Sequence, residues 1–176
     1  MKTIFILIGP KGSGKSYIGE LIEKTLSIHF MPIEPLFMKI KGSRDNTDES
    51  YIKEGFALVE KEIHHCLIKE GNVIIEQTGA ADYFIQFLKN LESKFRVKLI
   101  KIYAPLDMCN KRIKKRDSKN QIPISQELID KINKRSMSIK LNFALTIDNS
   151  KSTDTEIIES FKTILKKGDI NYPCLF

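Results

Sequence analysis

The chain has 176 residues, of which 41% are hydrophobic and 29% charged, and this composition excludes a disordered chain. It fits one folded domain over residues 1–176, long enough to bury a core. The 29 basic and 22 acidic residues give a net charge of +7, which favours an anionic partner such as a nucleotide, a phosphorylated metabolite or a nucleic acid.

Apolar runs typical of buried strands alternate with stretches of helical apolar spacing. In chain order we predict a strand at 3–8, a helix at 15–28, a short strand within 30–37, a polar loop at 41–50, a helix at 51–71, a strand at 72–79, a helix at 81–91, a strand at 97–105, helices at 107–116 and 124–139, a strand at 143–150 and a helix at 155–166. The alternation predicts a three-layer α/β fold with a mainly parallel, five-stranded sheet and helices on both faces.

The segment GPKGSGKS, residues 9–16, follows the first strand and opens the first helix. It matches the phosphate-binding pattern G-x-x-x-x-G-K-[ST] in full and in the required context, and a chance glycine-rich turn before a helix is the alternative. Its backbone N–H groups and the helix N-terminus can bind phosphates of ATP or GTP. Lys15 can reach the β- and γ-phosphates, and Ser16 can ligate Mg²⁺. We predict these nucleotide-binding residues: Gly9, Lys11, Gly12, Ser13, Gly14, Lys15, Ser16 and Tyr17.

The rest of the chain argues against a GTPase. The segments 110–113 and 133–136 begin with Asn-Lys but lack the aspartate of the base-reading N-K-x-D motif. The three cysteines, Cys66, Cys109 and Cys174, have neither metal-binding nor disulfide spacing, so we expect a reducing, cytoplasmic location. No stretch reaches the ~18 apolar residues of a membrane span, so no membrane partner is expected.

With this loop the chain resembles the small P-loop kinases related to gluconate, shikimate and nucleotide kinases. The segment 109–135 resembles the lid of polynucleotide-kinase-like phosphotransferases, with the candidate lid at 109–125. The resemblance implies ATP and Mg²⁺ as cofactors, transfer to a hydroxyl group, and Arg116 on the ATP phosphates with Arg112 beside it. A solvated basic helix face is the alternative for the two arginines. The resemblance also makes Asn149, after the last strand, a candidate contact to adenine.

Within this group the shikimate kinases carry an aspartate pair after the second strand and a glycine triplet after the third. This chain has PIEPLF at 32–37 and EQTGA at 76–80 instead. By those two motifs the shikimate kinases are a poor match, and the polynucleotide and gluconate kinases resemble the chain better.

Transfer to a hydroxyl needs a carboxylate that orients the acceptor and takes its proton late. Among Glu34, Asp45, Asp48 and Glu76, two stand out. Glu34 lies just past the second strand, where related kinases place an acceptor-facing acid, although a surface glutamate in a proline-rich turn is the simpler interpretation. Glu76 ends the third strand, at the ligand-binding edge of such sheets, and either helps to hold Mg²⁺ or faces the acceptor.

Three functions follow as hypotheses. The first is a Mg-ATP-dependent kinase for a hydroxyl of a small metabolite or nucleoside, and the second a kinase for 5′-hydroxyl ends of nucleic acid. The third, from another class, is a nucleotide-binding regulatory protein with little transfer activity. The sequence does not give the acceptor or the oligomeric state.

Overall fold

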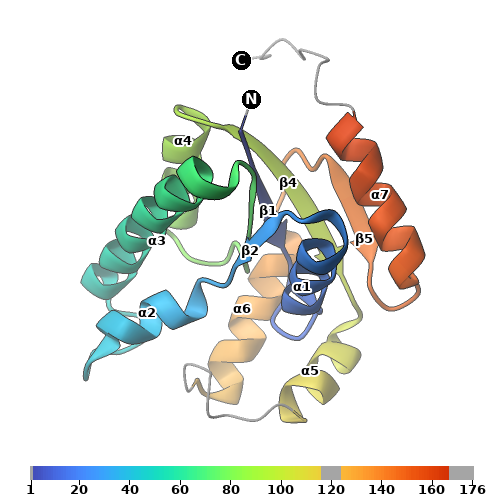
Figure 1. The fold of residues 1–176 in the computed structure, drawn as a ribbon. Coiled ribbons are helices and arrows are strands. Elements are labelled where there is room, and N and C mark those ends of the chain that lie inside the picture. The colour runs from blue at the N-terminus through green and yellow to red at the C-terminus, as the bar shows by residue number, and fades with distance from the viewer. Residues whose placement is uncertain (1, 116–123, 167–176) are drawn as a thin grey trace.

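A computed structural model describes residues 2–115 and 124–166. Five strands form one sheet in the order β2-β3-β1-β4-β5, and every neighbouring pair is parallel, so the predicted α/β fold is confirmed (Figure 1). The central strand β1 pairs with β3 on one side and β4 on the other, with Ile6 opposite both Ile75 and Leu99. The strands are β1 Thr3–Ile8, β2 His29–Met31, β3 Val73–Gln77, β4 Arg96–Tyr103 and β5 Leu145–Asp148.

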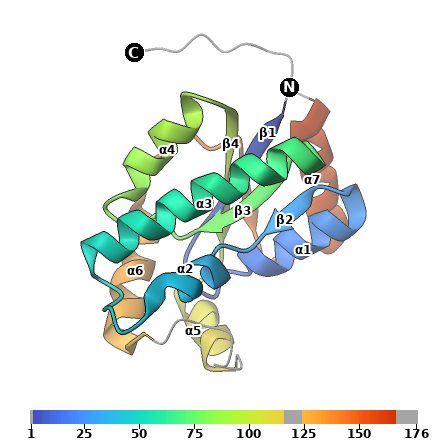
Figure 2. The same cartoon turned by 60° about the vertical axis from the view of Figure 1, so that its left-hand side comes forward.

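Helices cover both faces of this sheet (Figures 1 and 2). α1 (Lys15–Leu26) and α7 (Asp154–Lys166) lie on one face, and α3 (Glu49–Glu70) and α4 (Phe84–Glu92) on the other. Because side chains alternate along a strand, β1 feeds both cores. Ile4, Ile6 and Ile8 join the α3/α4 side, whereas Phe5 and Leu7 join the α1/α7 side. Because β1 is buried on both faces, its sequence is the nearly continuous apolar run TIFILI.

Three further helices, α2 (Glu34–Lys41), α5 (Leu106–Lys114) and α6 (Gln126–Ser138), lie toward the carboxyl ends of the strands (Figure 1). The strand predicted within 30–37 is only partly right, since β2 ends at Met31 and α2 begins at Glu34. Pro35 is in the first turn of α2, where its fixed φ and missing N–H suit a helix start. Among the described helices, none is long and apolar enough to span a membrane.

Candidate active site

The loop between β1 and α1 has the backbone that its glycines predict. Gly12 and Gly14 take positive φ values of 84° and 93°, which side chains rarely adopt. A Cβ on Gly12 would lie 2.4 Å from the carbonyl oxygen of Cys109, and one on Gly14 would lie 2.0 Å from Nδ2 of Asn149. Close approach of the neighbouring backbone and side chain, as well as dihedral angle, therefore requires glycine at both positions.

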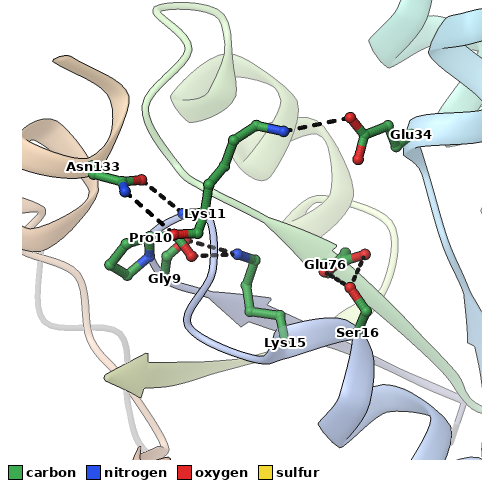
Figure 3. Close-up of polar contacts among 8 residues, drawn as sticks. All are labelled: Gly9, Pro10, Lys11, Lys15, Ser16, Glu34, Glu76 and Asn133. Carbon is green, nitrogen blue, oxygen red and sulfur yellow. Dashed lines mark hydrogen bonds and ion pairs between the residues drawn. The ribbon is translucent and has the colours of Figure 1, made fainter. Parts of the chain in front are cut away.

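Figure 3 shows Ser16 in contact with Glu76 beside this loop, and Lys15 turned toward Gly9 and Pro10. Lys15 is 7% exposed, and its Nζ donates to the carbonyl oxygens of Gly9 at 2.9 Å and Pro10 at 2.8 Å. The hydroxyl of Ser16 lies 3.0 Å from both carboxylate oxygens of Glu76, at the end of β3. A hydroxyl beside a carboxylate is a donor set of hard oxygens, which suits Mg²⁺. The pairing of these two residues fits the predicted metal site.

Side chains from distant parts of the chain hold the outer side of the loop. Asn133 of α6, 2% exposed, accepts a hydrogen bond from the Lys11 N–H at 2.7 Å and donates one to the Lys11 carbonyl at 3.2 Å (Figure 3). Asn149 donates to the Ser13 carbonyl at 2.8 Å. Arg112 donates to the carbonyls of Gly12 and Ser13 at 3.4 and 3.3 Å and to that of Asn149 at 3.2 Å. Of the loop N–H groups, these bonds use only that of Lys11; their other contacts with the loop are to its carbonyls.

Of the other predicted site residues, most have described contacts, and Arg116 lies outside the described residues. Lys11 reaches across to Glu34, with 3.4 Å between Nζ and Oε1 (Figure 3). Tyr17 is 48% exposed, and its hydroxyl donates to Asp154 at 2.6 Å, which ties α1 to α7. The predicted roles of Arg112 at phosphate and Asn149 at adenine stay predictions, while the structure shows both at the loop backbone. α5 ends at Lys114, and Arg116 and most of the second half of the candidate lid lie outside the described residues.

Two cavities adjoin at this place. The first, of about 160 Å³, is lined by the phosphate-binding loop and by Glu34 and Glu76. The second, of about 430 Å³, lies between α2, α3, α6 and the segment after β3. Five residues line both cavities: Lys11, Glu34, Phe37, Gln77 and Thr78. A group bound at the loop and a molecule in the second cavity would therefore meet beside Glu34.

Cys109 lies beneath the loop and is fully buried. Burial raises the pKa of its thiol, although the nearby Arg112 and Lys15 act in the opposite direction. A buried thiol with a raised pKa is a poor nucleophile, so Cys109 has a packing role.

Sequence reasoning missed two residues of this site, Asn133 and Gln77. Both are buried polar side chains in apolar settings, since Gln77 ends the run NVIIEQ and Asn133 follows Ile129 by four residues on the buried side of α6. A polar residue on the apolar face of a helix or in a buried strand is costly unless it is bonded, and that signal could have identified both.

Comparison with known proteins identifies the group. The family profile described as shikimate kinase matches residues 11–166. A shikimate kinase of Clostridium botulinum is 30% identical over 94% of this chain and 98% of its own length. Among solved structures, a Janibacter sugar kinase covers 96% of both chains with 13% identity and a TM-score of 0.69. The shikimate kinase of Acinetobacter baumannii, in complex with shikimate, covers 97% of this chain and 96% of its own with 16% identity and a TM-score of 0.63.

The chain therefore belongs to the shikimate kinase family and is an ATP-dependent kinase with a hydroxyl acceptor. The predicted membership of the small P-loop kinases is confirmed. The sequence-based preference for the polynucleotide and gluconate kinases over the shikimate kinases is wrong, because the family profile that matches is that of the shikimate kinases. That preference relied on two short segments on the acceptor side. The family match extends along most of the chain. The departures at 32–37 and 76–80 still stand, and they lie beside the second cavity.

Proposed function

We propose that this member of the shikimate kinase family transfers the γ-phosphoryl group of Mg·ATP to a hydroxyl of a small molecule held in the second cavity. The observation that carries the proposal is the junction of the two cavities, where Glu34 lies between the phosphate-binding loop and the larger cavity. The acceptor oxygen would form the new bond to γ-phosphorus as the bond from γ-phosphorus to ADP breaks. The leaving electron pair stays on ADP, and the hydroxyl proton passes to Glu34.

Residues at and beside the phosphate-binding loop would take distinct roles in this phosphoryl transfer. Lys15 compensates the charge of the β- and γ-phosphates, and loop N–H groups orient them. Ser16 and Glu76 would hold Mg²⁺, directly or through water, and the ion supplies charge neutralisation on the phosphates. Lys11 holds the Glu34 carboxylate in place through their ion pair. By the resemblance, Arg116 stabilises charge on the transferred group.

The names of the relatives make shikimate the first acceptor to test. The alternatives of a 5′-hydroxyl polynucleotide kinase and of a regulatory protein without transfer are decided by the same assay. ADP release from Mg·ATP is measured with shikimate, gluconate, nucleosides and 5′-hydroxyl oligonucleotides, with Lys15→Ala as the inactive control. A small molecule that raises ADP release well above background supports the proposal. A response to oligonucleotides alone, or to no acceptor although ATP binds, would overturn it.

A further inference from the structure

We propose that the acceptor is a neutral hydroxyl compound with a flat and largely apolar body, bound by a hydrogen bond from the Gln77 side-chain amide. The inference rests on the proposed function, and it excludes a carboxylated polyol such as shikimate as the preferred substrate. Three observations carry it: the aromatic wall of the second cavity, the pairing of its cations, and the unpartnered donor of Gln77.

The first observation is the wall that α2 and α3 form. The ring of Phe37 meets those of Tyr51 and Phe56 edge to face, with centroids 5.7 Å apart in each case. Gly55 makes room for this ring, because a Cβ there would lie 2.2 Å from Cε1 of Phe37. Phe37, Tyr51 and Phe56 all line the cavity. Rings held in this way present a fixed apolar surface, which favours a flat apolar ligand over a hydrated polyol.

The second observation concerns charge. Three cations line the second cavity among the described residues, and each is paired with a carboxylate. Lys11 pairs with Glu34 at 3.4 Å, Lys131 with Glu127 at 2.8 Å, and Arg135 with Asp82. The side chains of Lys131 and Arg135 are also 72% and 55% exposed, so neither cation is buried against the apolar wall. Among the described residues, a carboxylate on the acceptor would meet no buried, unpaired cation in this cavity, and burying it there without such a partner is costly.

The third observation is Gln77, the last residue of β3. Its side chain is 8% exposed and lines both cavities, and its buried Nε2 has no hydrogen-bond partner among the residues that the structure describes. Its backbone carbonyl, by contrast, accepts a bond from the Gly9 N–H at 3.2 Å. A buried donor without a partner destabilises the fold, and such groups concentrate where a ligand completes them. An ether, carbonyl or hydroxyl oxygen of a neutral acceptor would supply the missing partner.

Acceptor turnover tests the charge and shape of the ligand. ADP release is measured with the neutral ring compounds adenosine, thymidine, tyrosol and methyl shikimate, and with the carboxylates shikimate, quinate and gluconate. Methyl shikimate and shikimate form a matched pair that differs only at the carboxyl group, which the methyl ester makes neutral. We expect the best neutral compound to exceed the best carboxylate in kcat/KM by about tenfold or more. Equal or better turnover of a carboxylate overturns the inference but leaves the proposed function intact. No turnover with either set overturns both.

Gln77→Leu tests the donor by a second route. With the best acceptor we expect KM for the acceptor to rise about tenfold while KM for ATP is unchanged. Because the variant removes an unpartnered buried donor, its melting temperature should be unchanged or higher. Gln86→Leu is the control, since Gln86 on α4 is exposed and bonds only Asn90 among its described hydrogen bonds. A lower melting temperature for Gln77→Leu, or an unchanged acceptor KM, would make Gln77 a structural residue and overturn its role.

Discussion

Lys15 and Glu34 face the same cavity, but different kinds of structure hold them. Lys15 is the seventh residue after β1, inside the eight-residue motif at 9–16, and its Nζ is held by two carbonyls of that same loop. Glu34 opens a short helix, α2, and is held by Lys11 from another part of the chain. On the nucleotide side, the phosphate-binding loop is thus local backbone that distant side chains hold from outside, whereas the acceptor side is built from side chains of α2, α3 and α6. A family can change the second side without altering the first.

The largest expected effect falls on the nucleotide side. Lys15→Ala should lower kcat by at least about 10³-fold, because it removes the charge that compensates the phosphates in the transition state. Its melting temperature should fall only modestly, because the variant loses the bonds from Nζ to the Gly9 and Pro10 carbonyls but leaves the apolar core intact. Steady-state kinetics and thermal unfolding measure the two quantities. Normal turnover of a folded Lys15→Ala protein would contradict the kinase mechanism.

Arg116→Ala should have the next largest effect, a loss of roughly 10³-fold in kcat if the arginine acts on the transferred group as the resemblance implies. Lys115→Ala, one position before it, is the control for a mere loss of positive charge, and we expect it to be nearly silent. Single-turnover measurements separate chemistry from product release. If both substitutions had equally small effects on kcat, Arg116 would be a solvated surface residue without a role in transfer.

Glu34→Gln tests the junction between the two sides. The substitution keeps the shape of the side chain but removes its ability to take the acceptor proton, so kcat should fall by about 10²-fold or more while KM for ATP changes little. Lys11→Met breaks the same ion pair and leaves the carboxylate in place, so it should cost less. The assay compares kcat of the two variants. If Lys11→Met were as damaging as Glu34→Gln, the carboxylate would serve only to hold the loop.

Asn133→Ala should have the smallest effect of the series. It removes two hydrogen bonds to the backbone of Lys11, worth about 1 kcal/mol each, and should raise KM for ATP by about tenfold through a looser loop. Ser136→Ala on the same helix is the matched control, because Ser136 is equally buried but its hydroxyl has no described partner. Nucleotide titration measures the ATP affinity of both variants. An unchanged affinity in Asn133→Ala would show that the loop holds its shape without α6.

The contrast between the two sides also explains what the sequence could predict. The phosphate-binding loop lies in one contiguous stretch with a buried strand before it and a helix after it, so its position and backbone were predictable from the motif and its context, while the roles of its residues stay predictions. The strands were predictable for a similar reason, because a strand buried on both faces is a continuous apolar run. Both signals are local in sequence.

Contacts between distant parts of the chain offered no such signal. Asn133 meets Lys11 across 122 positions of the chain, and no local pattern indicates which backbone a buried asparagine will bond. α2 was missed because Pro32 and Pro35 limited a strand prediction, although a proline also suits the first turn of a helix. Glu34 was identified only as a candidate, since its pairing with Lys11 depends on how α2 packs above the loop.

The most direct test of the account follows the phosphoryl group itself. ATP labelled at the γ-phosphate is incubated with the protein, Mg²⁺ and the acceptor that most increases ADP release, and the products are separated. We expect label in a phosphate ester of the acceptor, in equal amount with ADP, and no labelled ester with Lys15→Ala. Label found only in inorganic phosphate would contradict the account, because it would mean that the two cavities do not exchange a phosphoryl group.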